Sequence, residues 1–493
     1  MRMSTMEKFG CGSVLGMLAA LLVLCGCQGL SNSPTTTTPP PNNLGINSIN
    51  HIVFMAQENR SLDTYFGQLP AYWATHNFPP QQFDGIPANA TNPSFDGTTN
   101  ISAFHFATQC IENLSPSWNE SHLDWNLHEP TSSTATMDGF VYNAAKFAMD
   151  NAFTDTAGAR AMGYYDGDDL NYYYFMASNF ATSDSWFAPA LNRTQVNRMY
   201  LFAATSQGYA YPPGTNANDN APLTAPTIFE ALDKAGVSWK VYYTDDICST
   251  SIPDARGPRG AIVHAAAASS NSGACTYLTQ FATYALPNEL PANVQPLSQY
   301  LDDAKNGNLP SVSFIETGYL SQKDEHPSSG TNVQTGAAYA AGLINALMTG
   351  ASWKDSVFIL TYDEPGGTYD HVAPLQGPVA VSPDGIKPKD LQPGDICTNG
   401  TGINCDFTTS GFRLPLLVVS PFTKKNFVSH TPADYTAILK FIETRFGLQP
   451  LTARDAAQMD MTEFFDFGAA AWATPPTPPD QATNGVCNAN VLQ

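Results

Sequence analysis

The stretch that decides the fold is SVFILTYDEPGGTYDH, Ser356–His371. Its first part is apolar and rich in β-branched residues, which is typical of a buried strand, and it ends at Asp363 and Glu364. Two adjacent carboxylates followed by two glycines and a histidine indicate that this strand delivers acidic side chains into a crevice at its carboxyl end. Because neighbouring carboxylates repel each other, they need a cation or a shared proton, and we expect a bound metal.

A second segment near the start of the chain is built in the same way. Ile52–Ala56 has the pattern of a strand, and Glu58 and Asn59 follow at its end. Together with Asp363 and Glu364 they offer hard oxygen ligands, which suit Mg, Ca or Mn better than an ion that prefers thiolates. The two segments therefore predict a divalent metal ion, whose identity the sequence leaves open.

The N-terminus has the pattern of an export signal. Arg2 and Lys8 precede an apolar stretch, Val14–Leu24, and residues 1–26 predict a signal peptide too short to span a bilayer. The ending Leu-Cys-Gly-Cys is similar to a bacterial lipobox and makes Cys27 the acylated residue. Ordinary signal cleavage nearby is the alternative. We expect an exported protein, either a cell-envelope lipoprotein or a secreted one.

The rest of the chain divides into a tether and one large domain. Residues 27–45 are rich in proline and threonine and cannot build a core, whereas residues 46–493 predict a single domain the size of a large α/β enzyme. Exported cysteines favour disulfides, and the pairs closest in sequence are Cys397 with Cys405 and Cys248 with Cys275. The pairing is otherwise open among the six cysteines of the domain, Cys110, Cys248, Cys275, Cys397, Cys405 and Cys487.

The charge of the chain excludes some partners. The formal net charge is -21, and only 13% of the residues are charged. Such a mildly acidic surface repels nucleic acid and anionic membranes at long range. We therefore expect no nucleic-acid partner, and contact with a membrane only through the N-terminal lipid anchor.

Strands and helices alternate along the domain. This alternation predicts a mostly parallel central sheet with helices on both faces and ligands beyond the carboxyl ends of its strands. Thr431–Pro432 and Gly447 have the pattern of the start and the stop of the last helix. The predicted strands are 52–56, 238–244, 310–315, 356–361 and 414–420, and the predicted helices are 227–236, 297–306, 335–349 and 433–446.

One long segment, about 70–191, has little periodic order and many aromatic residues. Long irregular segments of this kind often form lids or substrate walls, so we expect an irregular lid insertion here. Its cluster Tyr172–Phe175 is interpreted as core rather than as a substrate contact.

The motifs resemble one known family. Glu58–Gly67, ENRSLDTYFG, is similar to the ENRSFDHYFG opening of the bacterial phosphoesterase family that holds phospholipases C and acid phosphatases. The resemblance extends over about 50–467 and implies a core like that of alkaline phosphatase. Further blocks of the family pattern follow in order at 137–140, 162–165, 194–198, 324–327, 362–371 and 413–422.

The resemblance assigns roles to the residues near the strand ends. Thr194 stands where the family pattern has its nucleophile, and its hydroxyl joins Glu58, Asn59, Asp363 and Glu364 as a metal ligand. A threonine hydroxyl ionises far above neutral pH, so a cation beside it lowers that cost and neutralises phosphoryl oxygens. The alternative is structural: a capping pair after the first strand and a loop pair of carboxylates after the second.

Histidines are the expected proton donors to the leaving group. His326, in Asp-Glu-His-Pro, matches a family histidine and is the first choice, with His122 and His371 as further candidates. Arg198 either clamps the phosphate or forms a salt bridge that holds the turn of Thr194.

Three positions depart from the family pattern. Many relatives have histidine where Pro365 and Tyr435 stand, and another histidine is expected at Ser117. These departures affect the assignment of the acid more than the set of ligands.

The resulting hypothesis is a metal-dependent hydrolase of phosphate esters, of the acid phosphatase or phosphodiesterase type, that works through a phosphothreonine. The chain ends soon after Asp460–Phe467, without the C-terminal β-domains expected of haemolytic phospholipases C. A phospholipase C acting on phosphatidylcholine-like lipids is therefore the runner-up. A surface lipoprotein that binds without turnover is the alternative of a different class.

Overall fold

The structure is a computed structural model, and it describes residues 45–213, 221–244, 276–285, 292–319, 321–328, 330–377 and 387–493. These residues belong to one compact unit, Asn43–Gln493. The predicted signal peptide, nearly all of the tether, and both Cys248 and Cys275 lie outside the described residues. Within the described ranges, no helix is long and apolar enough to cross a membrane.

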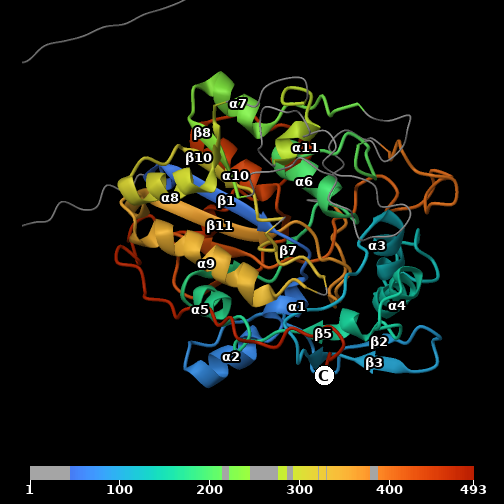
Figure 1. Ribbon diagram of the computed structural model, residues 1–493. Coiled ribbons are helices and arrows are strands. Elements are labelled where there is room, and N and C mark those ends of the chain that lie inside the picture. Colours follow the sequence, from blue (N-terminus) through green and yellow to red (C-terminus); the bar gives the residue numbers. More distant parts are fainter. Residues whose placement is uncertain are drawn as a thin grey trace, which may run out of the picture. The chain divides into compact units, whose positions relative to one another are not determined.

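An eight-stranded sheet forms the centre of the unit (Figure 1). All neighbouring strands pair in parallel except β12, which is antiparallel to both β11 and β6. The predicted mostly parallel sheet is therefore confirmed. In spatial order the strands are β13 (Phe427–Ser429), β6 (Ala181–Ser183), β12 (Leu417–Val419), β11 (Ser356–Tyr362), β1 (His51–Gln57), β10 (Val312–Ile315), β8 (Trp239–Tyr243) and β9 (Val294–Pro296).

Helices cover both faces of this sheet. Trp239 and Tyr242 lie three residues apart in β8, so their side chains point to opposite faces. Trp239 packs against Phe229 of α7 (Ile228–Ala235), with 4.8 Å between ring centroids, and Tyr242 packs against Tyr300 of α8 (Leu297–Asn306) at 5.5 Å. The predicted two-sided cover is confirmed. The predicted helices 297–306 and 335–349 correspond to α8 and to α9 (Val333–Thr349).

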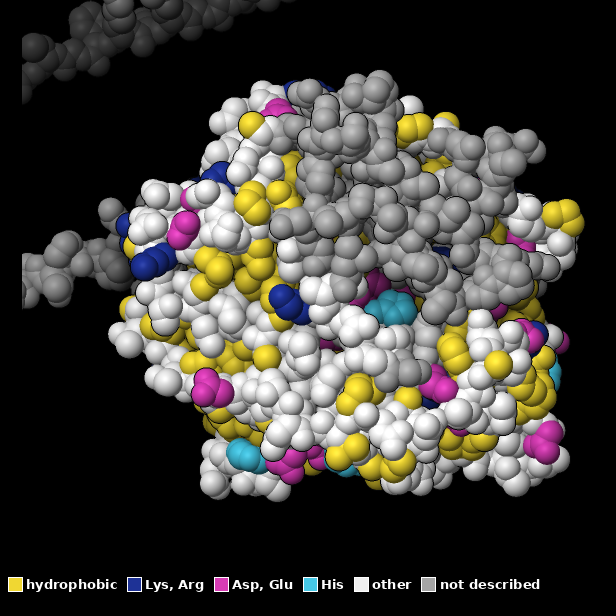
Figure 2. Space-filling model, viewed as in Figure 1, with side chains coloured by type: hydrophobic (Ala, Val, Ile, Leu, Met, Phe, Trp, Pro, Cys, Tyr) yellow, Lys and Arg dark blue, Asp and Glu magenta, His cyan; other side chains and the backbone are white. Residues whose placement is uncertain are grey.

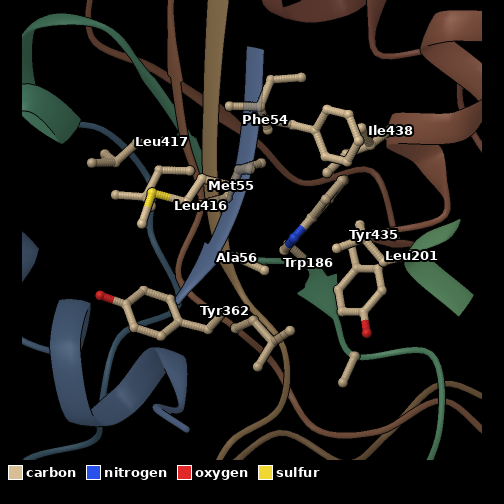
Figure 3. Close-up of a cluster of buried hydrophobic side chains, with 14 of the residues drawn as sticks. Phe54, Met55, Ala56, Trp186, Leu201, Tyr362, Leu416, Leu417, Tyr435 and Ile438 are labelled. Atoms are coloured by element: carbon tan, nitrogen blue, oxygen red, sulfur yellow. The ribbon is translucent and has the colours of Figure 1, made fainter. Parts of the chain in front are cut away.

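The buried core lies where β1 and β11 meet the helices (Figure 3). Phe54 and Ala56 of β1 are fully buried, and Leu201 of α6 (Thr194–Ala203) and Ile438 of α10 (Ala437–Phe446) pack in the same cluster. Trp186 adds a polar link, because its indole N–H donates a hydrogen bond to the hydroxyl of Thr361 at 2.9 Å. This packing fixes the strand ends that carry the site.

The last predicted helix starts later than its sequence pattern indicates. Ala433–Asp434 forms a short strand, β14, which pairs with β7 (Trp186–Phe187), and α10 begins only at Ala437. Thr431–Pro432 is therefore not its cap. The pairing of the backbone with β7 outweighs the local helical pattern here, whereas Gly447 ends the helix as predicted, in the left-handed conformation that glycine favours (φ 68°).

The segment 70–191 has more regular structure than predicted. Its helices are α2 (Leu69–His76), α3 (Trp118–Trp125), α4 (Phe140–Asn151) and α5 (Asn171–Asn179), and short strands β2 (Thr91–Pro93), β3 (Asn100–Ser102), β4 (Phe104–His105) and β5 (Gly163–Tyr164) lie among them. Tyr172, Tyr173 and Tyr174 are buried in α5, which confirms their interpretation as core. A role of the segment as a lid stays a prediction.

Two disulfides fasten the described chain. Cys397–Cys405 is the predicted local pair, and Cys110–Cys487 joins residues 377 positions apart. Around the second bridge, the backbone N–H groups of Ala107 and Gln109 donate to the carbonyls of Leu492 (2.9 Å) and Val486 (2.6 Å). The C-terminal segment is thus held against the chain that precedes α3.

Basic side chains are scattered over the face of the molecule shown in Figure 2. Among the described residues on that face, Lys and Arg side chains occur singly or in small groups, between polar and hydrophobic ones. This agrees with the low content of basic residues, 22 Lys and Arg against 43 Asp and Glu.

A buried pair of carboxyl groups makes stability depend on pH. Glu443 of α10 lies beside Asp455 of α11 (Ala453–Ala456), and both accept the N–H of Leu451, at 3.3 and 2.7 Å. Burial, together with the charge of Asp455, raises the pKa of Glu443 to about 10. Since the unfolded chain releases this proton near pH 4.5 and the folded chain keeps it, stability falls as pH rises between these values.

We expect Glu443→Gln to remove this loss of stability at high pH. The glutamine side chain has no proton that titrates, and its amide N–H can donate to Asp455. At pH 8 the free energy of unfolding should increase by an amount on the order of 1 kcal/mol, and the midpoint of thermal unfolding should rise with it. At pH 5 both increases should be smaller. Circular dichroism at both pH values measures this, with the exposed Glu129→Gln as control. An equal shift at the two pH values contradicts the raised pKa of Glu443 as the cause.

Candidate active site

The carboxyl ends of β1 and β11 bring the acidic segments together. Gln57 and Tyr362, the last residues of the two parallel strands, are paired in register, so Glu58 and Asp363 follow at the same edge of the sheet. Asn59 takes a left-handed backbone (φ 65°). A side chain at Gly366 would place its Cβ 2.6 Å from the Asn59 carbonyl oxygen, so only glycine permits this close approach.

Thr194 is the first residue of α6 and reaches the same edge from a third segment. The turn before it is held by Asn197, which accepts the N–H of Ala190 at 3.0 Å and donates to the carbonyl of Asn192 at 2.7 Å. Both asparagine contacts fix the approach of the chain to the helix. Thr194 is only 2% exposed.

Three oxygen atoms surround the Thr194 hydroxyl. Its Oγ1 lies 3.2 Å from Glu58 Oε2, 3.4 Å from Asn59 Oδ1 and 3.4 Å from Glu364 Oε1. Asp363 completes the group through the backbone, since its Oδ1 accepts the N–H groups of Asn59 (3.1 Å) and Glu364 (2.8 Å). The structure therefore brings the five predicted ligands into one cluster from three distant segments.

The donor set of this cluster fits a hard divalent cation. The Thr194 hydroxyl has one proton and three acceptors around it, so its hydrogen bond satisfies only one of them. Burial, followed by the charge of Glu58, raises the pKa of Asp363 to about 8, and burial with the charge of Asp363 raises the pKa of Glu364 well above its usual value. The raised pKa values indicate that too little positive charge lies near these carboxylates. Oxygen ligands of this kind suit Mg, Ca or Mn.

Arg198, one turn further along α6, supplies part of the missing charge. Its Nη2 donates to Glu58 Oε1 at 2.9 Å, and its Nε donates to Asp363 Oδ2 at 3.3 Å. The rings of Tyr277 and Tyr319 lie 4.9 and 5.5 Å from the guanidinium. Its Nη1 is buried and has no hydrogen-bond partner among the described residues. Arg198 thus forms ion pairs with two of the proposed ligands at the strand ends. A role in clamping the phosphate stays a prediction.

The loop with His326 lies beside this cluster. The Glu58 N–H donates to the carbonyl of Asp324 at 2.8 Å, and burial with the charge of Glu58 raises the pKa of the Asp324 carboxyl well above its usual value. His326 Nδ1 donates to the Pro327 carbonyl at 2.9 Å, so this nitrogen carries a proton. Sequence reasoning missed Asp324, although it stands two residues before the histidine in the same block.

Glu325 fixes the conformation of this loop. The carboxylate is fully buried and accepts hydrogen bonds from the hydroxyls of Tyr173 (2.6 Å) and Tyr362 (2.7 Å) and from the amide of Gln57 (3.0 Å). Gln57 and Tyr362 end the two central strands. The loop that carries His326 is therefore tied to the same strand ends as the proposed ligands.

The other two predicted histidines lie elsewhere. His122 is fully buried, and its ring nitrogens contact the carbonyls of Trp118 (2.6 Å) and Asn404 (2.9 Å). Burial lowers the pKa of His122. Within the described chain, it makes no hydrogen bond to the cluster around Thr194, so the structure gives His122 a structural position.

His371 belongs to a separate group of charges. Its Nδ1 contacts Asp63 Oδ2 at 2.8 Å, and Arg413 donates to Asp63 (3.0 Å) and to Asp370 (2.9 Å). Asp63, Asp370 and His371 lie close enough together to hold a metal ion, as do His105, Asp166 and Asp169. In the first group the guanidinium of Arg413 already supplies the positive charge.

Known proteins resemble this chain over most of its length. The model of the Phosphoesterase family matches residues 49–449. Phospholipase C B of Mycobacterium tuberculosis is 30% identical over 463 residues, covering 88% of this chain and 80% of the relative. Non-specific phospholipase C5 of Arabidopsis thaliana is 29% identical and covers 83% of this chain and 72% of its own length.

Two further proteins resemble this chain. Non-hemolytic phospholipase C of Burkholderia pseudomallei is 28% identical and covers 88% of this chain but 61% of the relative. Among solved structures, a protein in the alkaline phosphatase superfamily from Vibrio parahaemolyticus matches with a TM-score of 0.31 and 12% identity, covering 80% of this chain and 78% of that one. A score this low adds nothing to the assignment of the fold.

The chain belongs to the phosphoesterase family, whose model covers most of its length. It is therefore a hydrolase that acts on phosphate esters, and the acidic groups of its structure can hold a metal ion.

Proposed function

We propose that this protein is a metal-dependent phosphate-ester hydrolase in which Thr194 is the nucleophile. One observation carries the proposal: the Thr194 hydroxyl lies within 3.4 Å of Glu58, Asn59 and Glu364 at the carboxyl edge of the sheet. A binding protein has little need for buried carboxylates around a hydroxyl, because their mutual repulsion is costly. A divalent cation held by these oxygens would ease ionisation of the hydroxyl and neutralise phosphoryl oxygens.

The chain's own residues then perform a two-step transfer. Thr194 Oγ1 loses its proton to a carboxylate of the cluster, of which Glu58 is nearest, and forms a bond to phosphorus. The bond from phosphorus to the leaving oxygen breaks in line, and that oxygen takes a proton from a neighbouring acid. Water then attacks the phosphothreonine and gives a proton to the group that acted as the acid. The bond from phosphorus to Thr194 Oγ1 breaks, phosphate or its monoester leaves, and Oγ1 takes back the proton held by the carboxylate.

His326 is our choice for the acid. The hydrogen bond to Pro327 keeps one proton on Nδ1, so the proton given to the leaving alcohol comes from Nε2 of the imidazolium. Neither His122 nor His371 is included, since their ring nitrogens are engaged in contacts away from Thr194.

The substrate class has two candidates. The site chemistry supports a phosphatase or phosphodiesterase, and the phospholipase C names of the relatives, which cover 83–88% of this chain, support a phospholipid substrate. p-Nitrophenyl phosphate and p-nitrophenylphosphorylcholine, assayed on protein loaded with Mg, Ca or Mn, separate them. We expect hydrolysis of at least one. A folded protein without metal and without activity on either favours a binding lipoprotein instead.

We also infer that Cys27 carries a lipid anchor. The lipobox-like ending supports acylation, and the tether of residues 27–45 is long enough to separate the domain from a membrane. Cys27→Ala is expected to move the protein from the membrane fraction to the soluble fraction and to abolish labelling by a palmitate analogue. Unchanged fractionation and no labelling of the wild type contradict the anchor.

A further inference from the structure

Tyr435 lies beside the segment that leads to Thr194. It follows β14, and its N–H donates to the Phe187 carbonyl of β7 at 3.2 Å, seven residues before Thr194. In the close-up of the core its ring lies near Trp186 and Leu201, and its hydroxyl points away from Ile438 (Figure 3). The aromatic ring is therefore part of the core, whereas the hydroxyl is directed out of it.

The surroundings of this hydroxyl are polar and charged. Tyr435 is fully buried, yet its Oη has no hydrogen-bond partner in the described ranges of the chain. In Figure 3 the hydroxyl points in the direction in which β1 runs from Phe54 to Ala56, toward the strand ends that carry the proposed site. Burial, followed by the charge of Asp363, raises the pKa of this hydroxyl well above its usual value, which agrees with that direction.

Two other donors of the site share this condition. Arg198 Nη1 and Asn59 Nδ2 are both buried, and neither has a hydrogen-bond partner among the residues that the structure describes. A buried donor without a partner loses its hydrogen bond to water and gains none in return, so several in one place are unfavourable. The oxygens of the site are gathered around Thr194, and these donors remain for an incoming group that brings acceptors. A phosphoryl group has such oxygens.

We propose that Tyr435 is a substrate-binding residue, whose hydroxyl donates a hydrogen bond to a non-bridging phosphoryl oxygen next to Arg198 Nη1 and Asn59 Nδ2. The inference rests on the proposed function and adds a residue to it. The three donors together would distinguish the tetrahedral oxyanion from the neutral alcohol that leaves.

Tyr435→Phe tests this directly in the full chain loaded with Mn²⁺. We expect kcat/KM for the better of the two p-nitrophenyl substrates to fall by about 10- to 100-fold, and the dissociation constant of inorganic phosphate, measured by calorimetry, to rise by a similar factor. The midpoint of thermal unfolding should stay equal or rise, because the lost hydroxyl has no partner in the folded protein. If the hydroxyl were structural, its removal would lower the midpoint of thermal unfolding.

Tyr165→Phe is the matched control, since Tyr165 is also fully buried with a hydroxyl that lacks a partner among the described residues. Its neighbours are Arg60, Asp169 and Glu325 rather than the proposed ligands, so kcat/KM and phosphate binding should not change.

Unchanged kinetics and phosphate binding in Tyr435→Phe, or a lower unfolding midpoint, overturn the inference. If the wild type hydrolyses neither substrate, the proposed function is wrong, and phosphate binding alone then decides the role of Tyr435. A wild type that binds no phosphate rejects that role as well.

Discussion

Thr194→Ala is expected to reduce kcat by at least about 10³-fold while leaving the fold intact. The variant removes the hydroxyl that lies among Glu58, Asn59 and Glu364. Without it no phosphothreonine forms, and water must attack the ester without a positioned nucleophile. Steady-state assays and quenched mixing with a ³²P-labelled ester measure both effects, because the label should stay on the wild-type protein and be absent from the variant.

Two further variants give this result its meaning. Thr194→Ser keeps a hydroxyl at the same place and should retain part of the turnover. Thr182→Ala removes another buried threonine hydroxyl, which donates to the Leu416 carbonyl at 2.8 Å within the sheet, and should lower stability without lowering kcat. Wild-type turnover in Thr194→Ala would reject the threonine as nucleophile.

The strand ends could be predicted because their chemistry is local. The apolar run of β11 and the acidic pair after it are adjacent in sequence, and the parallel register of β1 and β11 places Glu58 and Asp363 at one edge. The start of α10 could not be predicted in this way. Ala433 pairs with a strand that lies more than two hundred residues away, and the sequence around it gives no sign of that partner.

The roles of single histidines could not be predicted from the sequence for the same reason, because their partners are distant in the chain. His122 was a candidate because imidazole suits acid catalysis, yet its partner at Nε2 is the carbonyl of Asn404, 282 positions away. A backbone carbonyl leaves no signature in a sequence. The position of the Tyr435 hydroxyl likewise depends on how β14 pairs with β7, two segments that are far apart in the sequence.

Glu364→Gln is expected to have opposite effects on stability and on activity. Glu58, Asp363 and Glu364 are buried together, and each negative charge raises the cost of the others, as the raised pKa values of Asp363 and Glu364 indicate. Removing one charge should therefore raise the unfolding midpoint of the metal-free protein. The same change removes an oxygen anion from the proposed ligand set, so activity should fall by at least about 10²-fold.

Metal addition separates these two effects. For the wild type, Mn²⁺ at about 100 times its dissociation constant should stabilise the fold by about 2.7 kcal/mol, and a chelator should reverse this together with the activity. In Glu364→Gln the same metal concentration should give a much smaller shift, because fewer charges attract the ion. The exposed Glu129→Gln should behave like the wild type in both measurements. If Glu364→Gln instead destabilises the metal-free protein and still gains full stability from Mn²⁺, the carboxylate is a structural group and the cation binds elsewhere.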